Sequence, residues 1–410
     1  MNSDRVLQSG DRICVAHLED AYLRRDVGAA SSAADCSVCA AEEVEAVPLE
    51  HLARVVLAAA RKRYDHVGFV PDGEQVLPTV PLRDVLATTL EDAVESDAHE
   101  PLVAAIEPLV RSSGPWYETF DEDTAVSTHF SWHHFDYRVK HQSRLLIAPT
   151  GEKPVTPPEW NYVLAREMVD FAAENSVPLI LAPGTLLYRA RVGRDAGDLA
   201  KRVRSDPSRE MGPPPTDSAS AGRLSAAGMP MLYTAREPET ACAEVASHSP
   251  YDDCVVATLE VRQPLRLLDL TVIPKLPSIF SPTYSHFASS RTAFEFYRDR
   301  MMDFIPGDDR QTMEYLPSQL LTEAFRWFSV PTIHGIAYPS AAGTGGTNIA
   351  LFFEDNEWIT EPGAQPNYLA SPSKPNTYAP DEWEFRGVLE VSADSVRQYK
   401  VEKRTAVHPV

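Results

Sequence analysis

The sequence has no long run of apolar residues and no apolar segment at its start. None of its apolar stretches approaches the roughly 18–20 residues that a membrane-spanning helix requires. The opening segment, MNSDRVLQSG, is polar, so the apolar core of a secretory signal is missing as well. We therefore expect a protein of the cytoplasm that makes no contact with a membrane.

Basic residues are also scarce relative to acidic ones. The chain has 38 lysines and arginines against 59 aspartates and glutamates, which gives a net charge of −21. A chain with this excess repels phosphate backbones, so nucleic-acid binding is not expected. Internal repeats and heptads are missing too, which argues against solenoids and coiled coils. With 410 residues, 43% of them hydrophobic, the chain is long enough for a globular protein of two domains.

Cysteine is rare, and the odd number of five argues against a secreted disulfide framework. Cys14 and His17 are separated by two residues, as are Cys36 and Cys39, and eighteen residues lie between these pairs. Two such pairs can supply the four ligands of a tetrahedral Zn²⁺ and leave no position open for catalysis. We therefore predict a structural zinc site. The alternative is a chance arrangement, with Cys14 in the core and His17 at the surface.

Hydrophobic residues at three- and four-residue steps predict helices in the first half of the chain. The predicted helices span residues 48–64, 81–96, 101–113, 124–146 and 159–175. After residue 178, short β-prone runs alternate with helical segments, which is typical of an α+β fold. Residues 206–222 are rich in proline, glycine and serine, and we expect a long loop over a site there. Residues 382–407 are expected to form two or three closing strands.

These patterns divide the chain into four parts. The predicted parts are a zinc-knuckle segment at 1–48, a helical domain at 49–150, a linker and helix at 151–177, and a mixed α/β domain at 178–410. The last part contains the candidate catalytic residues.

The first of these candidates lie at the end of a predicted strand, in the run Tyr188–Arg189–Ala190–Arg191. An arginine can bind a phosphate through two parallel hydrogen bonds. The alternative is an ordinary arginine on the surface of a strand. We expect only one of Arg189 and Arg191 to face a given cleft.

A cation, an aromatic ring and a carboxylate follow at short intervals. Arg223 lies in a loop of small residues, Tyr233 on a predicted strand, and Glu244 on a helix that begins near Pro238. This trio suits a ligand that carries phosphates and a positively charged ring. Taken alone, Glu244 could also be an ordinary surface glutamate.

A strand ending at Pro339 leads to Ser340 and a glycine-rich loop, AAGTGG, before a second strand. A serine in this place can bind a phosphate or a ribose hydroxyl. The flanking residues of a nucleophile elbow are missing, and no Lys-Ser/Thr pair follows the glycines as in a P-loop. The alternative is a glycine hairpin loop without a ligand.

Together these segments resemble the RES-domain family over roughly residues 178–354. The resemblance rests on an ordered set of runs: LYRAR, AGRLSAAGMPMLYTA, ETACAEV, EYLPSQLLTEAF, GIAYPS and NIALFF. One position departs from the family pattern, since Ser225 stands where the family usually has asparagine.

The resemblance implies a fold similar to that of ADP-ribosyltransferases. It also implies a toxin or defence effector that destroys NAD⁺ by hydrolysis or phosphorolysis of the nicotinamide–ribose bond. NAD⁺ would be the substrate and not a recycled cofactor. The expected partners are an antitoxin that restrains the enzyme or a partner that activates it, and a homo-oligomer is expected as well.

By matching position, the resemblance also implies a role for each candidate residue. Arg189 and Arg223 would hold the pyrophosphate or the nicotinamide ribose, and Tyr233 would stack on the nicotinamide ring. Glu244 would bind the ribose hydroxyls and stabilise the oxocarbenium-like charge, while Ser340 would orient the substrate. Two residues of the same runs would add substrate contacts, namely Tyr188 and Asn348.

The N-terminal region resembles the helical HEPN-like domain that precedes some RES domains. HEPN ribonucleases pair an arginine with a histidine, and Arg61 and His66 have a suitable spacing. An RNA-binding protein or ribonuclease is therefore one alternative function. An ADP-ribosyltransferase that modifies a macromolecule is another, although such enzymes often carry an acidic residue where this chain has Cys242. A scaffold without activity is the third, because fold resemblance does not prove activity.

Overall fold

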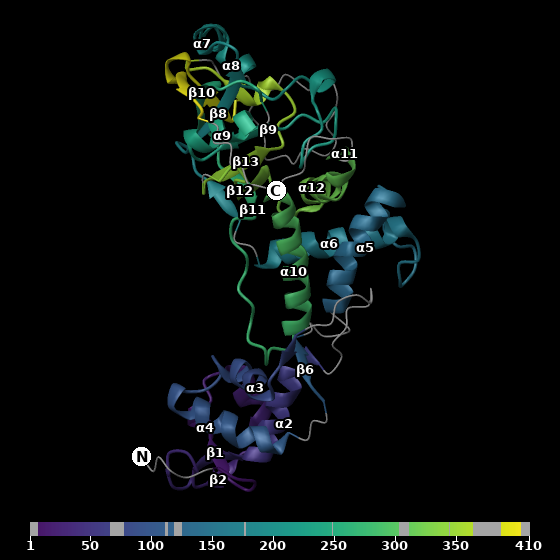
Figure 1. The fold of residues 1–410 in the computed structure, drawn as a ribbon, viewed down its shortest axis with the longest axis vertical. Coiled ribbons are helices and arrows are strands. Elements are labelled where there is room, and N and C mark those ends of the chain that lie inside the picture. Colours follow the sequence, from purple (N-terminus) through teal and green to yellow (C-terminus); the bar gives the residue numbers. More distant parts are fainter. Residues whose placement is uncertain are drawn as a thin grey trace, which may run out of the picture. The chain divides into compact units, whose positions relative to one another are not determined.

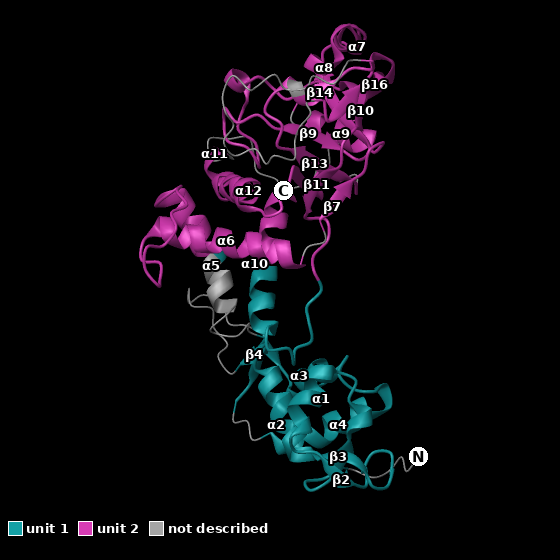
Figure 2. Ribbon diagram, turned by 180° about the vertical axis from the view of Figure 1, so that it is seen from behind, with its two compact units in different colours: residues 1–132, 275–293 teal, residues 133–274, 294–410 magenta. Residues whose placement is uncertain are grey.

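The computed structural model describes residues 7–65, 78–110, 114–118, 125–175, 178–247, 249–302, 311–343, 345–363 and 387–402. The chain forms two compact units, shown in different colours in Figure 2. Unit 1 comprises residues 1–132 and 275–293, and unit 2 comprises residues 133–274 and 294–410. Among the described helices, none combines the length and the apolar character that crossing a membrane requires.

Unit 1 contains two small antiparallel sheets. The first has the order β1-β3-β2, with β1 at Arg12–Cys14, β2 at Ser32–Ala34 and β3 at Val44–Pro48. The second has the order β4-β6-β5, with β4 at Tyr64–Asp65, β5 at Thr79–Val80 and β6 at Trp116–Glu118. The sequence analysis did not anticipate these strands, because runs this short show no alternation of apolar and polar residues.

The helices of unit 1 pack around one apolar core. They are α1 at Ala21–Gly28, α2 at Leu49–Ala60, α3 at Leu82–Leu90 and α4 at Ser96–Ile106 (Figure 1). The face of α2 that the pattern predicted is fully buried at Leu49, Leu52 and Val56. Helix α4 begins before the predicted start, and Pro101 lies inside it. Proline is favoured in the first turn of a helix, but it does not fix the first residue.

Unit 2 is built on a ten-stranded mixed sheet, and the predicted α+β fold is confirmed. Its strand order is β14-β15-β10-β8-β9-β13-β12-β11-β7, and β16 also pairs with β10. The pairs β11–β12 and β14–β15 are parallel, and the others are antiparallel. The bounds are β7 Leu179–Leu181, β8 Leu186–Gly193, β9 Leu232–Ala235, β10 Asp253–Val261, β11 Leu265–Asp269, β12 Gly335–Pro339, β13 Thr347–Leu351, β14 Ile359–Thr360, β15 Leu389–Val391 and β16 Arg397–Lys400.

Eight helices complete the described chain. They are α5 Ala125–His141, α6 Pro157–Asn175, α7 Ala196–Ser205, α8 Pro207–Glu210, α9 Pro238–Ser247, α10 Tyr284–Met302, α11 Gln311–Glu314 and α12 Leu316–Phe328. The predicted loop at 206–222 contains helix α8 and a 3₁₀ turn at Thr216–Ser218, so it is not wholly irregular. Asp206 caps α8, because its side chain accepts a hydrogen bond from the Arg209 amide.

The sheet of unit 2 is buried on both faces. One face carries a large apolar cluster that includes Leu187, Leu267 and Ile349. The other face meets α9 through small side chains, among them Ala190 and Ala235. Small residues let α9 approach β8 and β9 closely, and Figure 1 shows it beside these strands. This packing determines where the polar residues of α9 lie.

Candidate active site and candidate metal centre

The carboxylate of Glu244 is the centre of a polar cluster in unit 2. Ser340 Oγ donates a hydrogen bond to Glu244 Oε1 at 2.6 Å, and Asn348 Nδ2 donates to the same oxygen at 2.7 Å. Glu244 and Ser340 are half-buried, and Asn348 is buried. The fold thus brings together three of the predicted residues from α9, the loop after β12, and β13.

The hairpin of β12 and β13 positions the two hydrogen-bond donors. Tyr338 on β12 is registered opposite Asn348 on β13. The Ser340 amide donates to the Gly346 carbonyl at 2.9 Å and closes the loop, while Ser340 Oγ accepts from the Ala342 amide at 3.1 Å. The Ser340 hydroxyl therefore has a fixed position before it meets Glu244.

The same loop is anchored to the start of α9. The Thr347 amide and Thr240 Oγ1 donate to Glu237 Oε2 at 3.0 and 3.1 Å. Gly346 passes so close to α9 that a Cβ there would overlap with Thr240 Oγ1 and Glu237 Oε2. Only glycine permits this approach without a shift of the loop or of these two side chains. The sequence analysis missed Glu237, because a contact across the sheet leaves no pattern in the neighbouring sequence.

Tyr338 is a further aromatic residue at this cluster, and it is buried. Burial raises the pKa of its hydroxyl well above the usual value, and the charges of Tyr233 and Glu244 raise it further, against an opposing effect of Arg223. The charges of the predicted cation, ring and carboxylate thus all influence the pKa of this one tyrosine. The sequence analysis named Tyr338 only as part of the strand that leads to Ser340.

Tyr233 and Arg223 are held by separate contacts. The Tyr233 hydroxyl lies 3.1 Å from the hydroxyl of buried Ser225, and burial raises the tyrosine pKa. Arg223 Nη1 donates to the Met301 carbonyl, and its side chain is half-buried. Ser225, which departs from the family pattern, is therefore a partner of the predicted stacking residue.

Arg189 lies in a different environment. It is 7% exposed, and its two Nη atoms donate to the carbonyls of Tyr233 and Gly212 at 2.6 and 2.9 Å. Arg191 also donates to the Gly212 carbonyl, at 3.1 Å. The expectation that only one of these arginines can face a given cleft is therefore wrong, since residues two apart on a strand share a face. In this structure the guanidinium groups of both arginines bind backbone carbonyls, on β9 and in the chain segment that leads to it.

Tyr188, the other residue predicted on β8, packs at the opposite face. It is half-buried against the cluster that contains Ala190, Cys242 and Cys254. Cys242 is 4% exposed, so the position where transferases often carry an acid lies in this apolar layer. The structure does not bring Tyr188 into the hydrogen-bonded cluster around Glu244.

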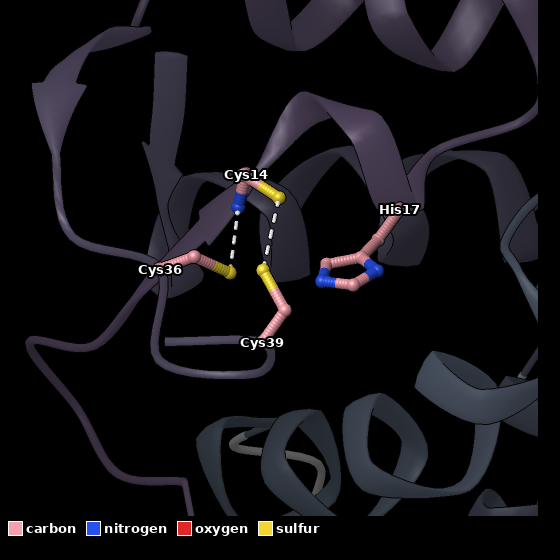
Figure 3. A group of neighbouring side chains, drawn as sticks. All are labelled: Cys14, His17, Cys36 and Cys39. Atoms are coloured by element: carbon pink, nitrogen blue, oxygen red, sulfur yellow. Dashed lines mark hydrogen bonds between the residues drawn. The ribbon is translucent and has the colours of Figure 1, made fainter. Parts of the chain in front are cut away.

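The predicted metal ligands of unit 1 do converge. Cys14, His17, Cys36 and Cys39 each offer a ligand atom, and these atoms all lie within 4.8 Å of one another. Figure 3 shows the four side chains gathered around one point. Cys14 Sγ lies 3.8 Å from Cys39 Sγ. The alternative that places His17 at the surface is wrong, because His17 is 5% exposed.

Hydrogen bonds to sulfur favour a thiolate at Cys36. The backbone amides of Cys14 and Val38 donate to Cys36 Sγ at 3.3 and 3.4 Å. Burial opposes ionisation of this thiol, but these amides and that of Cys39 lower its pKa to about 7. Burial and the neighbouring sulfurs instead raise the pKa of Cys14 to about 12. A metal ion, which stabilises thiolates, would relieve that cost.

A carboxylate fixes the ring of His17. Nδ1 of His17 lies 2.7 Å from Glu95 Oε2. Since an ionised carboxylate only accepts, Nδ1 carries a proton, and in the neutral ring Nε2 then presents a lone pair. Within the described part of the chain, buried Nε2 has no hydrogen-bond partner. This is the arrangement of a metal-binding histidine whose other nitrogen is oriented by an outer carboxylate.

The remaining N-terminal prediction cannot be placed. Arg61 follows directly after α2, but His66 lies outside the described residues. The proposed Arg61–His66 pair therefore stays a prediction.

Comparison with known families supports the assignment of the C-terminal region. Residues 186–368 match the family model of the RES domain. The matched region includes Arg189, Arg223, Glu244 and Ser340. The match does not extend to the N-terminal region, so the HEPN-like domain stays a prediction. No curated protein and no solved structure shows significant similarity to the chain.

Proposed function

We propose that unit 2 cleaves the nicotinamide–ribose bond of NAD⁺ and that the chain acts as a toxin or defence effector. The observation that carries this proposal is the carboxylate of Glu244, held on one oxygen by Ser340 and Asn348, with Tyr338 registered opposite Asn348 on the neighbouring strand. The match to the RES domain supports it. Depletion of NAD⁺ in a cell would account for toxicity.

The chemistry requires little beyond charge stabilisation. The bond between the ribose C1′ and the nicotinamide nitrogen breaks, and its electron pair leaves with the ring, which becomes neutral. The sugar develops positive charge, which the Glu244 carboxylate stabilises electrostatically, as carboxylates do in glycosidases. An oxygen of water or phosphate then bonds to C1′, and a proton is released when water is the acceptor.

The two hydrogen bonds to Glu244 fit this role. Both reach Oε1, so the two donors orient the carboxylate, while Oε2 accepts no hydrogen bond from the described residues and can meet ribose hydroxyls. The Ser340 hydroxyl acts as a positioning donor in this account, and no covalent nucleophile is required.

The cation for the pyrophosphate is assigned to Arg223. Its loop position and partial exposure leave the guanidinium accessible to an anion. Arg189 has both Nη atoms bound to backbone carbonyls, one of them that of Tyr233. We therefore assign Arg189 to the support of β9, and Tyr233 to the nicotinamide ring. Substrate contact by Arg189 or Tyr188 stays a prediction of the sequence.

Transfer of ADP-ribose to a macromolecule is less well supported. The position two residues before Glu244 is Cys242, which is buried in an apolar layer. It therefore offers no carboxylate to an acceptor group.

Incubation of the purified protein with NAD⁺, with and without inorganic phosphate, tests the proposal. Chromatography and mass spectrometry of the products distinguish the routes. ADP-ribose formed without phosphate means hydrolysis, and ADP-ribose 1″-phosphate formed only with phosphate means phosphorolysis. NAD⁺ that stays intact with the folded protein, also in the presence of cell extract as a source of an activator, would overturn the proposal.

For unit 1 we propose that Cys14, His17, Cys36 and Cys39 bind a structural Zn²⁺. The support is the convergence of four ligand atoms and the unpartnered Nε2 of His17. When bound, the ion would neutralise the thiolates and crosslink the loops around β1. Four protein ligands fill a tetrahedron, so this site would have no catalytic role.

A further inference from the structure

Two side chains at the start of α12 donate hydrogen bonds to three backbone carbonyls of the loop that contains Arg223, called the Arg223 loop below. Gln319 Nε2 donates to the carbonyls of Gly222 and Ser225 at 2.7 and 3.0 Å. Ser318 Oγ lies 2.6 Å from the Arg223 carbonyl, to which it donates. Both side chains are buried. These bonds span 94 to 97 positions of the chain, and the sequence analysis gave neither residue a role.

The base of this contact is itself rigid. Thr322, one turn further along α12, donates to the Ser318 carbonyl at 2.8 Å and lies 2.8 Å from the Tyr297 hydroxyl. Thr322 and Tyr297 are fully buried. The side chains of Ser318 and Gln319 therefore extend from a fixed helix end to the loop.

The loop needs such a support because its own sequence gives it little stiffness. Apart from Leu224, the residues around Arg223 are glycine, alanine and serine, and the Gly222 amide donates to the Ser225 carbonyl at 2.8 Å across the loop. A Cβ on Gly222 would lie 3.2 Å from the Tyr233 hydroxyl, a contact tight enough that the tyrosine would have to give way slightly. Small residues raise the entropy that is lost when the loop is ordered.

An amide is the side-chain type that this position requires. The NH₂ group of glutamine carries two donors, and here each meets one carbonyl. Glutamate has the same length but only accepts when ionised, so it would face two carbonyl oxygens without a donor. It would also add a negative charge close to the Arg223 backbone.

We propose that Ser318 and Gln319 are positioning residues that fix the Arg223 loop, so that the Arg223 guanidinium is preorganised for the phosphates of the substrate. This inference rests on the function proposed above. It assigns the start of α12 to substrate binding through Arg223, and not to contact with the substrate. Preorganised charge binds an anion without the cost of ordering the loop on each encounter.

Steady-state kinetics of Gln319→Met and Gln319→Glu, alone and combined with Arg223→Met, test this role. We expect Gln319→Met to raise KM for NAD⁺ about tenfold and to leave kcat nearly unchanged. This is the result when a substitution weakens binding of the substrate and of the transition state equally. In the Arg223→Met background the same substitution is expected to change KM less than about twofold, because the two residues act as one unit. Gln319→Glu is expected to have the larger effect, and Gln398→Met, at an exposed position of β16, none.

Hydrogen exchange separates this inference from the proposed function. The Gly222 and Gly228 amides are bonded within the loop, to the carbonyls of Ser225 and Ala219. They should exchange faster in Gln319→Met than in the wild type, while amides of α9 keep their protection. If the wild type leaves NAD⁺ intact while Gln319→Met shows this faster exchange, the function is refuted and the loop support is retained. Unchanged exchange and an unchanged KM, or equal effects of Gln319→Met in both backgrounds, would overturn the positioning role.

Discussion

The two candidate sites differ in how far apart along the chain their residues lie. All four ligands of the candidate metal centre come from positions 14–39 of unit 1. Glu244 in unit 2 meets partners that are 96 and 104 positions away. The first site needs only two turns and a small sheet, whereas the second exists only after a large mixed sheet has formed. A metal ion at the first site would therefore help unit 1 to fold, but the candidate active site depends on a unit 2 that is already folded.

The largest expected effect is the loss of the metal. Cys36→Ser should reduce bound zinc from about one ion per chain to a small fraction, because structural sites contribute about 10–16 kcal/mol of apparent binding free energy in small zinc modules. Metal analysis after gel filtration measures it. The matched control is Cys242→Ser in unit 2, which should keep the ion. Full zinc content in Cys36→Ser would contradict the prediction that Cys36 is a zinc ligand.

The second-largest expected effect is on kcat at the candidate active site around Glu244. Glu244→Gln should lower kcat for NAD⁺ cleavage about 10²–10³-fold, the range for removal of one preorganised electrostatic group. The thermal midpoint should change little, since a glutamine oxygen can still accept from Ser340 and Asn348. Glu239→Gln, an exposed position on the same helix, is the control and should keep its activity. A Glu244→Gln protein with nearly normal kcat would show that the assigned site is wrong.

Substitution of the two arginines separates support of the sheet from substrate binding. Arg189→Met should destabilise unit 2 by about 1–3 kcal/mol, because the Tyr233 carbonyl loses its Arg189 donor and the Gly212 carbonyl keeps only the bond from Arg191. Arg223→Met should lower activity and leave stability nearly unchanged. Urea denaturation followed by fluorescence, together with the NAD⁺ assay, measures both. If Arg189→Met were stable but inactive, Arg189 would return to the substrate-binding role that the sequence predicted.

The smallest expected effect is on zinc affinity, and it tests whether Glu95 orients the His17 ring. Glu95→Gln should weaken zinc binding about 10–100-fold without changing the number of ions bound, since the His17 ring loses its charged partner. Competition with a chelator measures this affinity. Glu91→Gln, an exposed residue nearby in the sequence, should bind zinc as the wild type does. Equal affinities in both variants would mean that Glu95 is only a surface acid.

Structure that depends on residues close together in the chain was predictable from the sequence, whereas contacts between residues far apart in the chain were missed. The helix at α2 and the strands β8 to β13 were predictable because their apolar periodicity lies within a few residues. Glu95 is 78 positions from His17, and its backbone amide also donates to the His17 carbonyl, a contact that no spacing rule reveals. The same holds for the assignment of residues 275–293 to unit 1, where Phe280 joins the apolar core.

The candidate active site shows a similar division. The types of its residues followed from the chemistry of a phosphate, a cationic ring and a ribose, and from the resemblance to a family. The partners of those residues did not follow. Arg189 was predicted as a phosphate ligand because any arginine can bind one, but burial between β8 and β9 gives its guanidinium carbonyl partners. Only the packed sheet distinguishes these two uses of the same side chain.

Gly346 makes the active site easy to lose by a single substitution. Any other residue would add a Cβ that overlaps with the side chains of Thr240 and Glu237, so these side chains or the loop would have to shift. Glu244, Ser340 and Asn348 could then all persist in the sequence while their hydrogen bonds are broken. A gene copy that drifts toward a non-enzymatic role could therefore keep every polar residue of the site. In a set of related sequences, glycine at this position would separate active copies from degenerate ones more sharply than the glutamate would.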